Sequence, residues 1–202
     1  FDIIWTNEID QDFTKLHSAG ITSWRKSRGN GVKAEIFNTK SIAEINTKDI
    51  VAEAFLSAKP NHFGIIGGPP CQDFSSRGNK KGFNGDLGKL TESFFNKIND
   101  LMPTFFVMEN VPGLLRINSH KEYLAAIVSK ISGKYSIKYQ ILNALNYGVP
   151  QSRERVFIIG INKSHINNFD EKSLIFPVSE KYVDALTKFN WPEAVKYGKE
   201  LK

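Results

Sequence analysis

Short apolar runs alternate with helical patterns along most of the chain. Runs of apolar, aromatic and β-branched residues over positions 1–6, 63–66 and 104–108 predict buried strands. Helices are expected over residues 10–19, where Gly20 ends the pattern, and over residues 50–58, 90–101 and 120–131. This alternation predicts an α/β fold built on an open, doubly wound and mostly parallel sheet, with helices on both faces.

The last two expected strands differ from the others in how they are connected. Residues 135–142 and 156–161 read as strands, and the sequence NALNYGVPQSRER lies between them. Gly and Pro make a crossover helix there unfavourable, and parallel strands need such a crossover. These two strands should therefore form an antiparallel pair at one end of the sheet. Two glycine-containing polar stretches, 24–33 and 73–88, predict exposed loops.

Composition narrows the class of protein. The 202 residues include 27 Lys and Arg against 21 Asp and Glu, and 41% are hydrophobic, values typical of one soluble globular domain. The net charge of +6 is compatible with a polyanionic partner but does not require one. No apolar run approaches the ~20 residues of a membrane-spanning helix. A single cysteine, Cys71, excludes an internal disulfide and a multi-cysteine zinc site, and no metal site is expected.

Cys71 is the first candidate for chemistry. Free cysteines usually pack as small buried hydrophobes. This one follows a Gly-Gly-Pro-Pro turn (residues 67–70) at the end of an expected strand, which would present the thiol to a cleft. The thiolate is the nucleophile, and the cationic side chains of Arg77, Lys80 and Lys81 would favour it.

An acid and two arginines are the other candidates. Glu109 ends a strand beside a bulky Val-Pro turn, and it either caps nearby backbone or, if partly desolvated, serves as a general acid. Arg153 and Arg155 are two residues apart, so on an extended segment they face the same side. They suit an exposed edge or the recognition of a carbonyl or phosphate group. Glu8 also follows a strand, so Glu8, Cys71 and Glu109 should meet at one rim of the sheet.

Three of these segments, in this order, resemble the motifs of the DNA (cytosine-5) methyltransferases. They are GGPPCQDFS (67–75), ENV (109–111) and QSRER (151–155). The resemblance implies the class I S-adenosylmethionine-dependent methyltransferase fold, with a catalytic core over residues 1–162. That core would be incomplete at its N-terminus, because the glycine-rich first motif is expected just before Phe1. Residues 163–202 would lead toward a target-recognition domain that these residues do not contain.

The same resemblance implies an enzyme that moves a methyl group from S-adenosylmethionine to carbon 5 of a cytosine flipped out of double-stranded DNA. Cys71 would add to carbon 6 of the base, and Glu109 would protonate or hydrogen-bond ring nitrogen 3. Arg155 would hold the carbonyl oxygen, and Arg153 would support the pocket. Asn110 would orient the Pro-Cys turn.

Further positions match cofactor-binding and DNA-binding residues of the family. Glu8 would receive the ribose hydroxyls, and Ser41 stands where the family commonly has an aspartate near the adenine amino group. The remaining cofactor positions would be Ile9, Ile42, Gly68, Pro70 and Leu90. The DNA-contacting loop would include Gln72, Ser75, Arg77, Lys80 and Lys81, with Ser75 near a phosphate.

The expected setting is a restriction-modification system, in the cytoplasm of a prokaryote or phage host, or in the nucleus of a eukaryote. Two alternatives share the fold: an RNA-directed cytosine-5 methyltransferase, and a non-catalytic subunit of a split enzyme whose second chain or further segments supply target recognition. A cysteine hydrolase would need His62 to activate Cys71, yet His62 precedes its strand and should lie at the opposite end of the sheet. The absence of GxGxxG disfavours a dehydrogenase.

Overall fold

The structure is a computed structural model that describes residues 2–29, 35–55, 58–70, 88–149, 151–165 and 174–178. Six predicted site residues lie outside these ranges: Cys71, Gln72, Ser75, Arg77, Lys80 and Lys81. Most of the predicted loop over 73–88 lies outside them too, and Gly88 already begins a helix.

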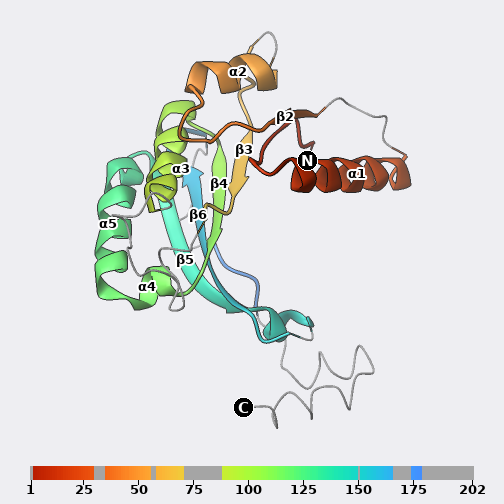
Figure 1. Ribbon diagram of the computed structural model, residues 1–202. Coiled ribbons are helices and arrows are strands. Elements are labelled where there is room, and N and C mark those ends of the chain that lie inside the picture. Colours follow the sequence, from red (N-terminus) through yellow and green to blue (C-terminus); the bar gives the residue numbers. More distant parts are fainter. Residues whose placement is uncertain are drawn as a thin grey trace, which may run out of the picture.

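The described strands form two sheets (Figure 1). Strands β1 (Trp5–Asn7) and β2 (Ile36–Asn38) pair in parallel in the smaller sheet. The larger sheet has the order β3-β4-β6-β5, with bounds Gly64–Gly67, Phe105–Asn110, Glu154–Asn162 and Tyr135–Asn143. In it β3 and β4 are parallel, whereas β4–β6 and β5–β6 are antiparallel. The predicted α/β class and the antiparallel pair at one end are confirmed. The single sheet expected from the sequence is seen as two sheets among the described residues.

The helices differ from the predicted bounds, most of all at the end of the first helix. They are α1 (Gln11–Ser27), α2 (Thr47–Phe55), α3 (Gly88–Leu101), α4 (Gly113–Arg116) and α5 (Asn118–Ser132), with 3₁₀ turns at Ala144–Tyr147 (η3) and Lys163–His165 (η4). The predicted stop at Gly20 is wrong, and so is the loop expected from Trp24, because α1 continues to Ser27. One glycine costs a helix about 1 kcal/mol, and the buried side chain of Arg25 anchors the last turn by donating to the carbonyl of Ile3.

Helices α3 and α5 cover one face of the larger sheet (Figure 1). Their side chains pack on alternate residues of β4 and β6, and the cluster includes Phe95, Ile98, Phe106, Met108, Leu124, Ile127, Ile131, Val156 and Ile158. Successive residues of a strand point to opposite faces. Glu109 and Arg155 lie out of phase with these buried positions. Both therefore project from the face of the sheet opposite α3 and α5.

A second apolar cluster connects the two sheets. Ile45, Ile50 and Leu101 form its buried centre, and Trp5 of the smaller sheet and Ile65 of the larger sheet pack against it. Strand β2 was not expected from the sequence, because its three residues contain only two apolar side chains. Within the described ranges, no helix combines the length and apolar character needed to cross a membrane.

Candidate active site

The turn that precedes Cys71 is fastened to the end of β4. Asn110, the last residue of β4, is buried, and its Nδ2 donates to the carbonyl oxygen of Pro69 at 3.3 Å. Its Oδ1 accepts from the backbone N–H of Val111 at 2.8 Å. Strands β3 and β4 are parallel neighbours, so their carboxyl ends lie together. One amide side chain thus fixes the turn after β3 to the turn after β4.

Glu109 and Arg155 form an ion pair beside this turn. Nε of Arg155 lies 2.8 Å from Oε1 of Glu109, with the two side chains 24% and 38% exposed. A Cβ atom added at Gly68 would lie 3.4 Å from Oε2 of Glu109, so the carboxylate also approaches the turn after β3. The partial desolvation expected for Glu109 is limited among the described residues, where a guanidinium faces it and more than a third of the side chain is exposed.

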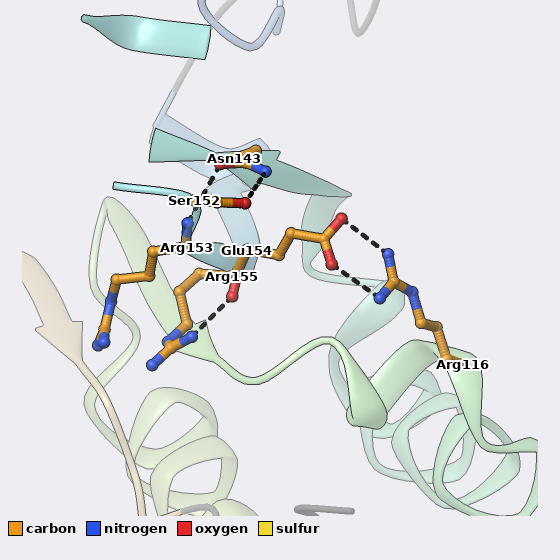
Figure 2. A network of polar contacts seen from close by, with 6 residues as sticks. All are labelled: Arg116, Asn143, Ser152, Arg153, Glu154 and Arg155. Carbon is orange, nitrogen blue, oxygen red and sulfur yellow. Dashed lines mark hydrogen bonds and ion pairs between the residues drawn. The ribbon is translucent and has the colours of Figure 1, made fainter. Parts of the chain in front are cut away.

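Glu154 contacts both Arg155 and a second arginine, Arg116. Nη1 of Arg155 donates to the main-chain carbonyl of Glu154 at 2.7 Å. The Glu154 carboxylate accepts two hydrogen bonds from Arg116, at 2.8 and 2.9 Å (Figure 2). The hydrogen bonds from Arg116 hold the pKa of Glu154 below its usual value, and those same bonds raise the pKa of Arg116. Neither Arg116 nor Glu154 was predicted as a site residue from the sequence. The one available signal was the position of Glu154 between Arg153 and Arg155, which places its side chain on the other face of the strand.

Arg153 lies just before β6, at the end of the connection from β5. Its backbone N–H donates to Oδ1 of Asn143 at 3.2 Å, and Nδ2 of Asn143 lies 3.4 Å from Oγ of Ser152. Figure 2 shows the side chains of Arg153 and Arg155 on the same side of the strand, away from the Glu154 carboxylate. This is the arrangement that their spacing predicts.

Glu8 and Ser41 belong to a separate group at the end of β1 and β2. The backbone N–H of Glu8 donates to the carbonyl of Asn38 at 3.2 Å. Nδ2 of Asn7 donates to the carbonyls of Asn38 and Lys40, at 2.9 and 2.8 Å. These bonds hold the chain just before Ser41 against the end of β1. The structure thus brings together four of the predicted cofactor positions, Glu8, Ile9, Ser41 and Ile42.

The remaining cofactor positions lie elsewhere. Gly68 and Pro70 belong to the turn after β3, and Leu90 is half-buried in the first turns of α3. No hydrogen bond or ion pair between described residues joins the Glu8 group directly to the Glu109 group. The structure places Glu109 near the turn that leads toward Cys71. The single rim for Glu8, Cys71 and Glu109 stays a prediction, because Cys71 lies outside the described residues.

Glu53 of α2 ties the smaller sheet to that helix, and sequence reasoning missed it. Nε1 of Trp5 donates to its Oε2 at 2.7 Å, and Nδ2 of Asn38 reaches both carboxylate oxygens at 3.1 and 3.2 Å. The hydrogen bonds from Trp5 and then Asn38 lower the pKa of Glu53. Strands β1 and β2 are thereby fixed to α2.

The position of His62 bears on the hydrolase alternative. His62 precedes β3, while Gly68 and the turn toward Cys71 follow it. Its ring lies 5.5 Å from that of His165 and contacts Thr104, at the amino end of the strand. This placement argues against His62 as the base for Cys71. In the described part of the chain, no cluster of His, Cys, Asp and Glu suits a metal ion.

Comparison with known proteins decides the family. The profile described as C-5 cytosine-specific DNA methylase matches residues 1–199. The chain belongs to this family. The type II methyltransferase M.NmeDI of Neisseria meningitidis serogroup C is 40% identical over 140 residues, which cover 69% of this chain and 29% of that protein. M.FnuDI of Fusobacterium nucleatum is 35% identical over 182 residues, which cover 90% of this chain and 46% of that protein. The chain thus spans less than half the length of either relative.

Solved structures of methyltransferases have the same fold. A protein described as a DNA modification methyltransferase encoded within an E. coli prophage superposes with a TM-score of 0.64 at 28% identity, covering 89% of this chain and 47% of that one. The S. pombe Dnmt2 methyltransferase superposes with a TM-score of 0.57 at 17% identity, covering 91% and 51%. The predicted class I methyltransferase fold is confirmed.

Proposed function

We propose that this protein transfers a methyl group from S-adenosylmethionine to carbon 5 of cytosine in double-stranded DNA. The observation that carries the proposal is the convergence of three motifs at one place. Asn110 joins the ENV motif to the Gly-Gly-Pro-Pro turn through Pro69, and the ion pair of Glu109 with Arg155 joins it to the QSRER motif. Three distant segments that meet in this way favour a catalytic centre over three unrelated structural features.

The residues around Glu8 fit the nucleoside part of the cofactor. Glu8 follows a parallel strand, where an acidic side chain suits the two ribose hydroxyls. Ile9 is 65% exposed beside it and offers apolar surface to an adenine ring. We assign the cofactor to Glu8, Ile9, Ser41, Ile42, Gly68, Pro70 and Leu90. When bound, S-adenosylmethionine supplies an electrophilic methyl group carried on a sulfonium sulfur.

The chain's own residues would activate the cytosine, whose carbon 5 is a weak nucleophile. The Cys71 thiolate adds to carbon 6, and the electron pair displaced from the 5,6 double bond makes carbon 5 nucleophilic. Glu109 donates a proton or hydrogen bond to nitrogen 3, and Arg155 donates to the neighbouring carbonyl oxygen. Nitrogen 3 and this oxygen lie on the same edge of the base, which suits a carboxyl and a guanidinium held side by side. After carbon 5 has been methylated, a solvent base would take its proton, and the electron pair of that C–H bond would restore the 5,6 double bond and expel the thiolate.

The loop after Cys71 would hold the DNA. A stacked base hides both ring faces, so the target nucleotide must leave the duplex before Cys71 can reach carbon 6. We assign phosphate and backbone contacts to Gln72, Ser75, Arg77, Lys80 and Lys81. The relatives named above are type II methyltransferases, which supports a restriction-modification setting in a bacterial cytoplasm. Recognition of the target sequence is assigned to a second chain or to segments outside residues 1–202.

Product analysis tests the proposal. The intact enzyme would be incubated with methyl-labelled S-adenosylmethionine and either duplex DNA or RNA, and the labelled nucleoside would be identified after digestion. We expect 5-methyldeoxycytidine from DNA, and no label with Cys71→Ser. Label only in RNA would favour the RNA-directed alternative. DNA binding without any transfer would favour the non-catalytic subunit.

A further inference from the structure

Among the described residues, β6 has no partner strand on one side at the position of Arg155. The β4–β6 ladder ends with Asn110 opposite Val156. On the other side, β5 pairs with β6 through Glu154, which lies opposite Asn143. Glu154 and Arg155 therefore extend past the end of β4, where backbone pairing no longer fixes them on that side.

Arg116 binds the side chain of Glu154 just beyond the end of this ladder. After β4 the chain turns at Val111-Pro112 into the short helix α4, of which Arg116 is the last residue. Its Nη1 and Nη2 donate to Oε2 and Oε1 of Glu154, at 2.8 and 2.9 Å. Two parallel bonds between a planar guanidinium and a carboxylate fix both the distance and the orientation of the pair.

Glu154 and Arg155 are bound on opposite faces of β6 by one continuous segment, residues 109–116. Glu154 and Arg155 point to opposite faces of β6, as successive strand residues do (Figure 2). On one face Arg116 binds the Glu154 carboxylate, and on the other Glu109 binds Nε of Arg155. The carbonyl of Glu154 also accepts from Nη1 of Arg155 at 2.7 Å. A shift of Glu154 would therefore move a direct anchor of the Arg155 guanidinium.

Stability alone does not account for the Arg116–Glu154 pair. The two side chains are 56% and 41% exposed, and exposed ion pairs contribute little to folding. Geometric control of a neighbouring group does not depend on a large contribution to folding. Both groups are charged at neutral pH, and their mutual hydrogen bonds lower the pKa of Glu154 and raise the pKa of Arg116.

We propose that Arg116 and Glu154 are positioning residues that aim the Arg155 guanidinium at the carbonyl oxygen of the target cytosine. They act through Arg155 and the Glu154 backbone and do not touch the base. The inference rests on the proposed function, since it assigns a purpose to the orientation of Arg155. Neither residue belongs to the sets assigned above to catalysis, cofactor or DNA.

The proposal can be tested by breaking the Arg116–Glu154 ion pair and, as a control, a second ion pair of similar exposure. Lys130 and Glu92 form an ion pair of similar exposure, 57% and 38%, at 2.9 Å between α5 and α3. In the intact enzyme, Arg116→Ala and Glu154→Gln should each lower kcat about tenfold or more, the scale expected when a catalytic group is misplaced. KM for S-adenosylmethionine should stay unchanged. Lys130→Ala should shift Tm by a similar amount and leave kcat at the wild-type value.

Two further variants separate orientation from charge and from folding. Arg116→Lys keeps the charge but loses the planar fork, and it should recover only part of the lost kcat. The reversed pair, Arg116→Glu with Glu154→Arg, should recover most of it. Folded Arg116→Ala enzyme with wild-type kcat, or a folded reversed pair with no recovery, would contradict the proposal. A wild-type enzyme that makes no 5-methylcytosine would instead overturn the proposed function.

Discussion

Nε of Arg155 lies 2.8 Å from Oε1 of Glu109, across the boundary between two antiparallel strands. The pairing of β4 with β6 sets this contact. Both residues occupy the phase of their strands that faces away from α3 and α5, and both lie at the end of the ladder where β4 turns away. The antiparallel return of β6 is thus what brings its arginine to the carboxyl end of β4. A fully parallel sheet would have placed Arg155 at the opposite edge.

Asn110 should matter to catalysis more than its hydrogen bonds matter to folding. Asn110→Ala leaves the carbonyl of Pro69 without this partner, which should cost about 1–3 kcal/mol of unfolding free energy. The turn before Cys71 would also lose its anchor, so methyl transfer should fall much further than stability alone explains. Chemical denaturation and initial-rate assays on the same preparation measure the two effects.

Asn162 provides the control for this prediction. It is also buried, and its Nδ2 likewise donates to a proline carbonyl, that of Pro103 at 3.4 Å. It lies at the far end of β6, away from Glu109. Asn162→Ala should lose similar stability and retain activity per folded molecule. Equal losses of activity in the two variants would reduce Asn110 to a structural residue.

Gly160 of β6 should tolerate no side chain. A Cβ atom there would lie 2.0 Å from Cε1 of the buried Phe106 ring, so Gly160→Ala must displace a core residue. Overpacking of this kind costs roughly 1–3 kcal/mol. Gly133 follows the end of α5, and a Cβ atom added there would meet nothing within 4 Å, so Gly133→Ala should be neutral or stabilising. Thermal unfolding compares the two, and an equally stable Gly160→Ala protein would show that the core is looser than described.

Glu53 should make the smaller sheet sensitive to acid. Hydrogen bonds from Trp5 and Asn38 lower its pKa below the ordinary value of 4.5 in the folded protein. A lowered folded pKa stabilises the protein above the unfolded value, and this contribution is lost as pH falls through the folded value. The difference in unfolding free energy between wild type and Glu53→Gln should therefore be constant near pH 7 and shrink below about pH 4.5. Denaturation followed by tryptophan fluorescence measures it, and a difference that does not change with pH would exclude this role for the Glu53 carboxylate.

Lys80 and Lys81 test the proposed DNA-contacting loop. Replacing both with alanine in the intact enzyme should weaken binding to all DNA sequences alike. The slope of log K against log salt should become shallower by up to about one unit for each phosphate that is no longer neutralised. Lys121→Ala on α5 is a suitable control and should leave the slope unchanged. An unaltered slope in the variant lacking Lys80 and Lys81 would show that these side chains face solvent and do not contact DNA phosphates.

Sequence reasoning predicted the elements with strong local signals and missed those set by distant contacts. Strands β4 and β6 have long apolar runs, and the antiparallel pairing of β5 with β6 was predicted from a connection too rich in Gly and Pro for a helix. The predicted end of α1 at Gly20 was wrong. The local stop signal of one glycine is weaker than the hydrogen bond by which Arg25 fixes the last turn to the carbonyl of Ile3. Strand β2 has too few residues to produce a pattern.

The candidate site shows the same division. The motifs singled out Glu109, Asn110 and Arg155, and the structure brings these residues to the turn before Cys71. Nothing in the sequence pairs Arg116 with Glu154, because that contact depends on where the short helix α4 directs its last residue. Glu53 was missed for a similar reason, since its partners Trp5 and Asn38 come from two strands that are distant from it in sequence.

Covalent trapping of the cytosine tests the central claim most directly. DNA with 5-fluorocytosine at the target position should become attached to the intact enzyme when S-adenosylmethionine is present, because fluorine cannot leave as a proton does and elimination stalls. Peptide mapping should place the DNA on Cys71, and Cys71→Ser should form no adduct, since an alcohol is barely ionised at neutral pH. Glu109→Gln should form the adduct much more slowly, because an amide is a far weaker acid than a carboxyl group and cannot supply the proton for nitrogen 3. An adduct that persists in Cys71→Ser, or an active wild-type enzyme that forms none, would contradict the mechanism.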